Sequence, residues 1–178
     1  MAKLRRYQPV LPFIAVYFRE SELLQKAVAE MGLVLGGFDK VSKSIDISYS
    51  RYYEEEMGSG LCKQWFASTI LADPTRLAAW KLASNEIERK YALDGNRRVN
   101  IDPGFVGLSK VVLASLKDHP QRIPLSDGVF AETELTYEDG HWHNLPWTYW
   151  DYADNPVKSF LMDVRTALYR QLKAEGYI

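Results

Sequence analysis

Apolar residues follow two different periods in the first part of the chain. The run LPFIAVYF at residues 11–18 is continuously apolar and rich in aromatic and branched side chains, which predicts a strand buried on both faces. A helix is predicted next, because Ser21 can cap it, apolar positions then recur every three or four residues, and Gly32 is placed to end it. Isoleucines that alternate with polar neighbours predict a half-buried strand over residues 43–53.

The middle of the chain repeats this order. Residues 61–72 are predicted to pair with the preceding strand across a Gly-Ser-Gly turn. Asp73-Pro74 supplies an N-cap and a first-turn proline, and apolar residues then recur at helical spacing as far as Tyr91. Alternation from Val99 onward and the apolar run at 109–117 predict two further strands.

The last third of the chain predicts a hairpin and a closing helix. A strand is expected at residues 129–137, and Asp139-Gly140 is a strong two-residue hairpin signal. Asn155-Pro156 opens a helix that Gly176 closes. The order of elements predicts an α+β fold, with a ferredoxin-like βαββαβ core, an added β-hairpin and a C-terminal helix, all in one domain over residues 1–178.

Composition and charge narrow the function classes. The 178 residues are 47% hydrophobic and 25% charged, which is an ordinary globular mixture. Because 22 basic residues face 23 acidic ones, no global field attracts nucleic acid or anionic lipid, so a nucleic-acid partner is not expected. Cys62 is the only cysteine, which excludes an internal disulfide. With no run long enough for a membrane span, we expect a cytoplasmic protein without a membrane partner.

The stretch GNRRVNIDPGFVG at residues 95–107 is the main candidate ligand site. In a strand, Arg98, Asn100 and Asp102 share one face, and Pro103-Gly104 is a plausible turn where a ligand can approach the backbone. Basic residues follow closely in the sequence. The candidate ligand-binding residues are Arg98, Asn100, Lys110, Lys117 and Arg122, and the candidate catalytic residues are Asp102 and Glu132.

These residue types fit an anion. Arginine forks and lysine point charges recognise phosphate or carboxylate, and a carboxylate beside them can hold magnesium or accept a proton. The alternative is a solvated strand face on which Arg98 and Asp102 pair with each other. The sequence fixes no set of metal ligands.

The segment EIERK, Glu86 to Lys90, has the E-x-E-x-K form found in tunnel-shaped triphosphate-processing enzymes. That site needs the three side chains on one face of a strand, whereas here the segment lies in a predicted helix, where residues two apart diverge. We therefore expect Glu86 and Lys90 to form an ordinary surface pair.

The predicted hairpin could carry a metal site. Strict alternation and pairing across Asp139-Gly140 would place three glutamates and two histidines on one face: Glu132, Glu134, Glu138, His141 and His143. A His-x-His beside carboxylates can bind zinc or manganese. The pattern favours the simpler interpretation, in which one face packs on the core and the other meets water.

The segment LPWTYWDY at residues 145–152 supports a rival function. Its aromatic residues can stack on a ring or anchor a protein interface, although they can equally fasten a loop under the last helix. The rival is a non-catalytic interaction module that uses residues 147–152 and exposed sheet edges to bind a partner protein or a second copy of the chain.

Four segments resemble a known family when taken in order: DISYSRYYEEEMGSGL, KLASNEIERKYA, the long central block from RRVNIDPG to TELTY, and LPWTYWDY. They are similar to a bacterial family of the domain-of-unknown-function class, domain of unknown function 4416. Some members carry an automatic GTP-binding label. The resemblance implies no catalytic residues, and the chain lacks the P-loop and the Asn-Lys-x-Asp guanine motif.

The sequence therefore predicts a protein that binds a phosphorylated or otherwise anionic small molecule, such as a nucleotide with magnesium. If it is an enzyme, phosphoryl or nucleotidyl transfer or hydrolysis is the expected reaction class. A homo-oligomer is compatible with this expectation.

Overall fold

The computed structural model describes residues 6–47 and 54–178. They contain a nine-stranded sheet in the order β2-β4-β1-β5-β6-β8-β7, with β3 beside β4 and β9 beside β8. The strands are β1 Leu11–Phe18, β2 Lys40–Val41, β3 Ile45–Asp46, β4 Cys62–Ala67, β5 Val99–Val106, β6 Lys110–Ser115, β7 Ile123–Pro124, β8 Phe130–Glu138 and β9 His141–Asn144. The helices are α1 Ser21–Leu35, α2 Glu54–Met57, η2 Pro74–Arg76, α3 Leu77–Tyr91, α4 Trp150–Ala153 and α5 Asn155–Ala174.

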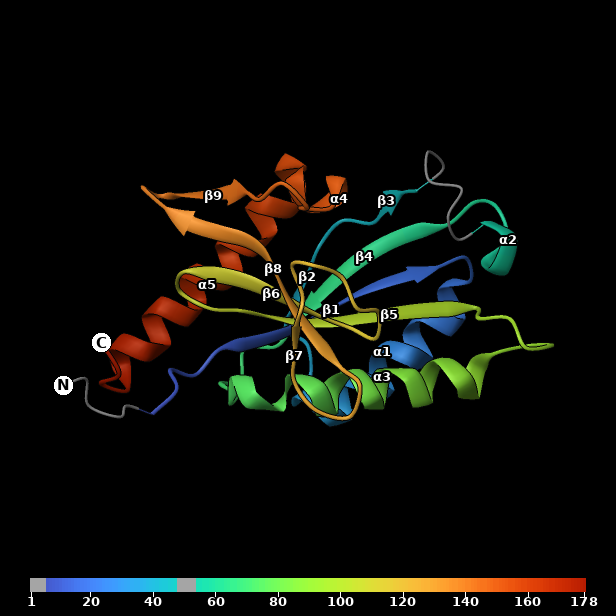
Figure 1. Cartoon of the computed structure of the whole chain (residues 1–178), viewed down its shortest axis with the longest axis horizontal. Coiled ribbons are helices and arrows are strands. Elements are labelled where there is room, and N and C mark those ends of the chain that lie inside the picture. Colours follow the sequence, from blue (N-terminus) through green and yellow to red (C-terminus); the bar gives the residue numbers. More distant parts are fainter. Residues whose placement is uncertain (1–5, 48–53) are drawn as a thin grey trace.

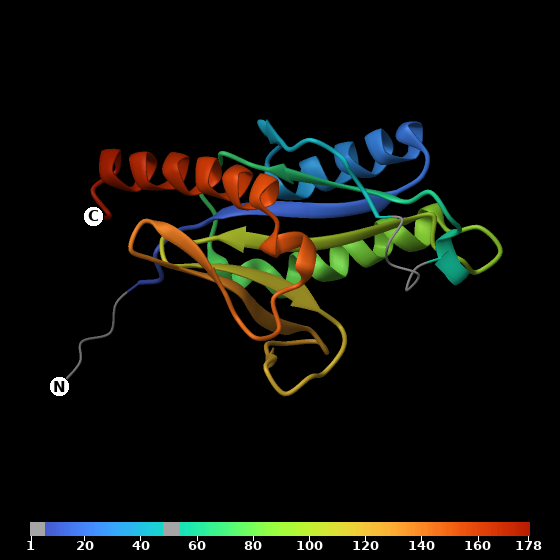
Figure 2. The same ribbon diagram turned by 90° about the horizontal axis from the view of Figure 1, so that it is seen from above.

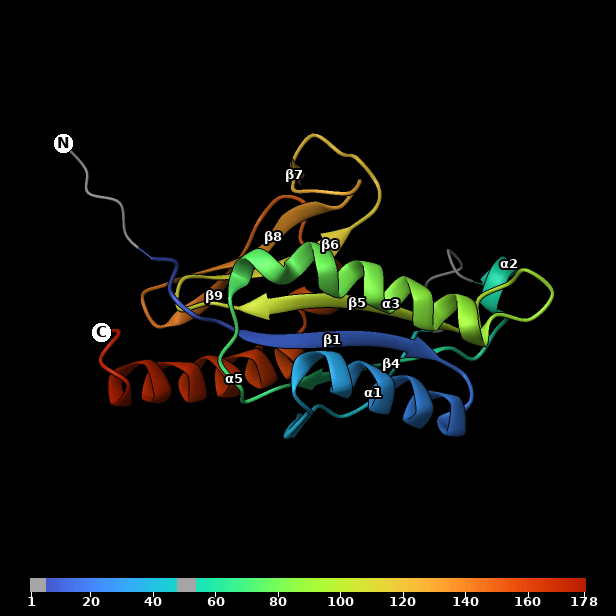
Figure 3. The same ribbon diagram turned by 90° about the horizontal axis from the view of Figure 1, so that it is seen from below.

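Helices cover both faces of the sheet. One apolar core joins α1 and α3 to one face, and a second joins α5 and Tyr152 of α4 to the other. In Figure 1, α1 and α3 lie together on one side of the strands, while α4 and β9 lie on the opposite side. In Figures 2 and 3, α5 and α3 both run along the strands, and they lie on different sides of the sheet. The fold thus has three layers.

The mixture of helices with an antiparallel sheet confirms the α+β class. Strand β1 lies between β4 and β5 and is antiparallel to both. Four strands extend the sheet beyond β5, and α5 adds a layer on the second face. The finer ferredoxin-like description stays a prediction. No helix in residues 6–47 and 54–178 is long and apolar enough to cross a bilayer.

The helix boundaries follow the predicted caps with two corrections. Asp73 accepts a backbone hydrogen bond at the start of η2, as expected, and α5 begins at Asn155, as expected, with Asp154 before it as the capping residue. The predicted cap at Ser21 is wrong, because α1 already begins at Ser21 and no side chain among the described residues caps it. The predicted end of α1 at Gly32 is wrong, because α1 continues to Leu35 and ends at Gly36, whose φ of 86° is left-handed. The apolar face extends one turn further than predicted, so the helix ends at the next glycine that can adopt this conformation.

The predicted turn at Pro103-Gly104 is also wrong. Strand β5 runs through both residues to Val106. Gly104 is required by packing, because a Cβ there would lie 2.7 Å from Phe13 Cζ and 2.4 Å from the Val112 carbonyl oxygen. Glycine thus lets β1 and β6 approach β5 closely.

The early strands are shorter than predicted. The strand predicted at residues 43–53 is described only as far as residue 47, and within that part the strand is β3, Ile45–Asp46; residues 48–53 lie outside the described residues. Strand β4 occupies the first half of the predicted range 61–72.

The predicted hairpin is confirmed, but one of its faces is not. Strands β8 and β9 pair with Glu138 opposite His141, and Asp139 and Gly140 both have positive φ, as a two-residue turn requires. The register shifts between Val111 and Val112, which leaves Glu134 as an extra residue on β8. This β-bulge breaks the alternation, so the predicted face that would join Glu132 and Glu134 to the histidines does not form.

Candidate functional site

Three neighbouring strands change from apolar to polar in the same direction along one face of the sheet. Their register places side chains in rows across β4, β1 and β5, on the face that α4 and α5 cover. From one end to the other, the rows are Leu11 with Val106, then Ala67, Phe13 and Gly104, then Trp65, Ala15 and Asp102, then Lys63, Tyr17 and Asn100. The polar end is the candidate site.

Lys63 forms the most deeply buried part of this end. Its ammonium is 3% exposed, donates to the Asp151 carboxylate and to Tyr17 Oη at 3.0 Å, and lies 5.0 Å from the ring centroids of both Trp65 and Tyr152. Burial alone would lower the pKa of Lys63, but the opposing effect of Tyr17 and Asp151 leaves that pKa well above its ordinary value. Lys63 is therefore a charged ammonium paired with a buried carboxylate.

The polar residues of β5 are held by a network that begins just before the strand. Arg97 donates to both oxygens of Glu56, with Nη2 to Oε2 at 2.6 Å, and to Asn100 Oδ1 at 2.5 Å. Asn100 in turn donates to Asp102 Oδ2 at 3.0 Å. The hydrogen bonds from Arg97 hold the pKa of Glu56 below its usual value.

Side chains of helix α3 form hydrogen bonds with the edge of β5 that β6 leaves unpaired. Strand β6 pairs with β5 only at residues 104–106, so the backbone of Ile101 has no strand partner on that side. The Ile101 N–H donates to Glu88 Oε1 at 2.6 Å, and Lys81 Nζ donates to the Ile101 carbonyl at 3.0 Å. Lys81 also pairs with Asp102 at 3.3 Å. Where β6 no longer pairs with β5, the charged side chains of Lys81 and Glu88 make the backbone hydrogen bonds that a neighbouring strand would otherwise make.

Strand β8 and the loop after β6 complete the site from the other side. Arg122 Nε donates to Glu132 Oε2 at 2.5 Å, and its two terminal nitrogens donate to the Lys117 carbonyl at 2.8 Å and to Tyr149 Oη at 2.9 Å. Burial raises the pKa of Tyr149, so its phenol stays protonated and can donate a hydrogen bond. The Arg122 side chain is 8% exposed, and each of its three nitrogens donates a hydrogen bond.

Glu134, the bulge residue, is the most perturbed carboxyl group of the site. It is fully buried, its Oε1 accepts the Tyr149 N–H at 2.5 Å, and its Oε2 has no hydrogen-bond partner among the described residues. Burial raises the pKa of Glu134 to about 8, and Glu132 and Asp151 act in the same direction. Burial also raises the pKa of Tyr17 to about 12.

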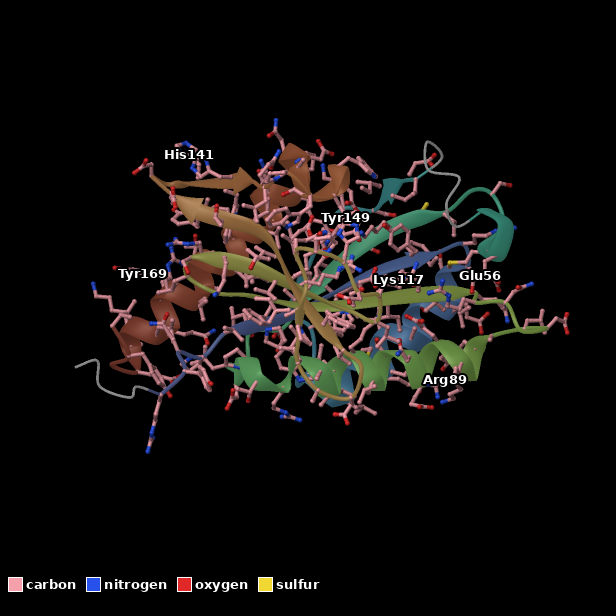
Figure 4. All side chains as sticks on the ribbon, in the orientation of Figure 1. Glu56, Arg89, Lys117, His141, Tyr149 and Tyr169 are labelled. Carbon is pink, nitrogen blue, oxygen red and sulfur yellow. The ribbon has the colours of Figure 1, made fainter. Side chains whose placement is uncertain are left out.

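These residues act on one another and form one group, the polar cluster. Asp102 affects the pKa of Tyr17, Glu88 and Tyr149, and Lys117 lowers that of Glu56. In Figure 4, Lys117 is labelled between Tyr149 and Glu56, whereas His141 and Tyr169 lie toward the other end of the molecule. The polar cluster comprises Tyr17, Glu56, Lys63, Lys81, Glu88, Arg97, Asn100, Asp102, Lys117, Arg122, Glu132, Glu134, Tyr149 and Asp151.

Solvent reaches only part of the polar cluster. The side chains of Asp102, Arg97 and Glu56 are 27%, 32% and 33% exposed, and Tyr149 and Lys117 are exposed residues. Lys63 and Asp151 lie beneath them, and both are buried. The polar cluster therefore has an accessible rim, formed by Glu56, Arg97, Asp102, Lys117 and Tyr149, above the buried pair of Lys63 and Asp151.

The structure brings together five of the seven residues that the sequence proposed. Asn100, Asp102, Lys117, Arg122 and Glu132 all belong to the polar cluster. Arg98 does not, because it pairs with Glu20 at 2.5 Å on the surface; the alternative interpretation, in which Arg98 pairs with Asp102, is therefore wrong as well. Lys110 lies at the start of β6, whereas Lys117 follows the end of that strand, and Lys110 lines a hollow outside the polar cluster.

Sequence reasoning missed several members of the polar cluster. A bend at Arg98 shifts the alternation by one residue, so that Arg97 reaches Asn100. Lys63 and Asp151 are 88 residues apart, and only the sheet register and α4 bring them together. One available signal was Lys63 itself, which stands beside Trp65 in a strand that ends in an apolar stretch.

The E-x-E-x-K segment lies on helix α3, as predicted, but its charges pair differently. Glu86 pairs with Arg89 at 2.5 Å, and Lys90 pairs with Glu30 of α1 at 2.7 Å. Glu88 points inward to the polar cluster. The expected pair between Glu86 and Lys90 is wrong.

Metal binding has limited support from the side chains. Within residues 6–47 and 54–178, no group of three or more histidine, cysteine, aspartate or glutamate side chains could hold a metal ion. Glu132 is already saturated by Arg122 and Gln121. Solvent reaches two carboxylates of the polar cluster: Glu56, whose two oxygens accept hydrogen bonds from Arg97, and Asp102. One carboxylate together with ligand phosphates is a common way for proteins to hold magnesium, and Asp102 is the better placed of the two.

Comparison with protein families shows to which family the chain belongs. The family model described as Domain of unknown function (DUF4416) matches residues 8–168. The chain belongs to this family. The match spans β1 to most of α5, so every residue of the polar cluster lies inside the family region. No curated protein and no solved structure matches the chain.

Proposed function

We propose that the protein binds a phosphorylated or otherwise anionic small molecule at the rim of the polar cluster. The observation that carries the proposal is the convergence of ionisable side chains from separate segments on one face of the sheet. Buried charges cost stability, and such groups with shifted pKa values gather at functional sites. A cluster of this size, with one open side, is best explained by ligand binding.

The rim offers donors to an anion. The Lys117 ammonium and the Tyr149 hydroxyl are exposed, and Arg122 fixes the hydroxyl by donating to its oxygen. Arg97 holds Asn100 in place, so its amide is oriented before a ligand arrives. Lys117 and Tyr149 would contact the anion, while Arg97 and Arg122 would position the groups around it.

Asp102 is the residue that would carry chemistry. It is accessible at the rim and accepts hydrogen bonds from Lys81 at 3.3 Å and from Asn100 at 3.0 Å, which hold its carboxyl group in place. A carboxylate in this position can accept a proton from a ligand hydroxyl or bind a magnesium ion that the ligand phosphates share. Phosphoryl or nucleotidyl transfer or hydrolysis remains the reaction class to test.

A thermal-shift panel tests the proposal. The purified chain is heated with sugar phosphates, nucleotides and metabolic carboxylates, each with and without magnesium. A ligand at a hundred times its dissociation constant stabilises the native state by about 2.7 kcal/mol, which raises the Tm of a chain of this size by about 5–10 °C. Melting curves that stay flat for every compound would overturn the proposal.

Two variants locate the site. Lys117→Ala and Tyr149→Phe should each reduce the ligand-induced shift, because each removes one rim donor. Arg98→Ala is the matched control, since this exposed arginine lies outside the polar cluster and pairs with Glu20. If the control loses the shift and the rim variants keep it, the ligand binds elsewhere.

The interaction module remains a second candidate. Trp147, Tyr149 and Trp150 are 38%, 46% and 45% exposed, so part of the 147–152 segment is available to a partner. Sedimentation velocity over a range of concentrations tests self-association directly. A dimer that Trp150→Ala dissociates, together with a flat ligand panel, would favour this function.

A further inference from the structure

A hollow lies on the opposite face of β6 and β8 from the polar cluster. Its volume is about 690 Å³, within the range of pockets that hold small organic ligands. Phe105 and Val112, which belong to the core beneath α1 and α3, contribute to its lining, and Leu77 at the start of α3 closes one side. This hollow does not depend on the function proposed for the polar cluster.

Large apolar side chains stand exposed around this hollow. Tyr7 is 70% exposed, Ile123 67%, Leu125 45% and Trp147 38%, and all four line the same space. They come from three separate parts of the chain, the segment before β1, the β7 region and the segment before α4. An apolar surface gathered in this way from distant segments marks a binding site.

Lys110 gives the hollow its electrostatic character. It is the one charged residue among the described residues that line the space. Within residues 6–47 and 54–178, no carboxylate forms an ion pair with Lys110, whereas Lys63, Lys81 and Lys90 each have one. An apolar wall with one uncompensated positive charge complements an apolar molecule that carries one negative charge.

We propose that this hollow binds a small amphipathic monoanion, such as an apolar carboxylate, with the acid group at Lys110. The apolar body would lie between Trp147 and Ile123 and displace water from both. The chemistry differs from that of the polar cluster, where several cations and carboxylates compensate one another and the expected ligand is strongly polar.

Two fluorescent probes that differ in one group test the proposal. The dye 8-anilinonaphthalene-1-sulfonate carries a sulfonate, and N-phenyl-1-naphthylamine has the same rings without it. Fluorescence titration should show that both bind the native protein, with the sulfonate bound more tightly. Octanoate should displace both probes, and octan-1-ol should do so about tenfold less well, the factor expected for one charge-assisted hydrogen bond at a partly exposed site.

Variants separate the charge from the apolar wall. Lys110→Gln should weaken the sulfonate probe about tenfold and leave the neutral probe unchanged. Ile123→Asp should weaken both, because it places a negative charge in the wall. The matched controls are Lys43→Gln and Leu93→Asp, which change an exposed lysine and an exposed leucine outside the hollow.

The outcomes are distinct. Loss of selectivity in Lys110→Gln, with an unchanged melting curve, supports the proposal. Failure of both probes to bind the native chain, or equal binding by wild type, Lys110→Gln and Ile123→Asp, overturns it. Binding that rises only when the protein dissociates at low concentration also overturns it, because the hollow would then be covered by a second copy. None of these results depends on the ligand panel for the polar cluster.

Discussion

One face of the sheet has two ends that are built from the same strands and differ in chemistry. At one end, Leu11 and Val106 share one buried apolar core with Leu161, Val164 and other residues of α5. At the other end, the same strands present charged and hydrogen-bonding groups to α4 and β8. The change takes place over two residues along each strand, so a single face holds both a stabilising core and a candidate site.

The strand partners explain why the change occurs where it does. At the apolar end β5 is paired on both sides, with β1 and with β6. At the polar end β6 has diverged, and side chains of α3 satisfy the free backbone of Ile101. An unpaired strand edge needs polar groups nearby, and each buried charge among them needs a partner of opposite sign.

The largest expected effect is at the polar end. Asp151→Ala leaves the buried Lys63 ammonium without its carboxylate and should lower the free energy of unfolding by about 3–5 kcal/mol. The double variant Lys63→Met/Asp151→Leu should recover most of this loss, because apolar groups of similar size tolerate the site. Urea unfolding measures both, with Asp163→Ala as the control, because Asp163 is an exposed residue of α5. A double variant as unstable as the single one would contradict the ion-pair argument.

The apolar end should respond to a different change. Leu168→Ala removes a fully buried side chain of α5 and should cost about 3 kcal/mol through lost burial and the cavity that remains. The same urea titrations measure it, and the ligand response of the polar cluster should be retained. If Leu168→Ala abolished the ligand-induced shift, the two ends could not be treated as separate.

The boundary between the two ends is at Gly104. A Cβ at this position would overlap the Phe13 ring and the Val112 carbonyl, so Gly104→Ala should destabilise the fold by about 1–3 kcal/mol. Gly107→Ala is the matched control, because its Cβ would lie at an ordinary 3.5 Å from the Lys110 carbonyl. Thermal unfolding distinguishes the two. Equal stability of both variants would show that the strands can move apart at this row.

The comparison also shows which features local sequence can predict. The helices at 77–91 and 155–174 and the hairpin at Asp139-Gly140 were found because their caps and turn residues act over a few positions. The shared face of Asn100 and Asp102 followed from strand alternation. These features depend on neighbours within one turn or one strand.

The remaining features depend on distant segments. The partner of Lys63 comes from α4, and the partners of Ile101 come from α3. The bulge at Glu134 exists because β8 must match β6, and this match reverses the side-chain alternation that the sequence suggests. Periodicity cannot reveal such adjustments, because each residue involved looks like an ordinary member of its own strand.

The smallest expected effect, measured per pH unit, sharpens the contrast between the two ends. The pKa of Glu134 is raised by burial from 4.5 to about 8, so the folded chain holds a proton there that the unfolded chain has released. Its contribution to stability is therefore fully present below pH 4.5 and declines as the pH rises toward 8. The slope from this group is at most about 1.4 kcal/mol per pH unit.

Glu134→Gln removes this dependence, because the amide does not ionise. Urea unfolding at pH 5, 6, 7 and 8 should show the variant close to wild type at pH 5 and increasingly more stable than wild type toward pH 8. Glu138→Gln, four residues along the same strand and exposed, is the control and should follow the wild-type curve. Parallel curves for wild type and Glu134→Gln would mean that this carboxyl group is ionised in the folded chain. The polar end would then carry one more uncompensated charge.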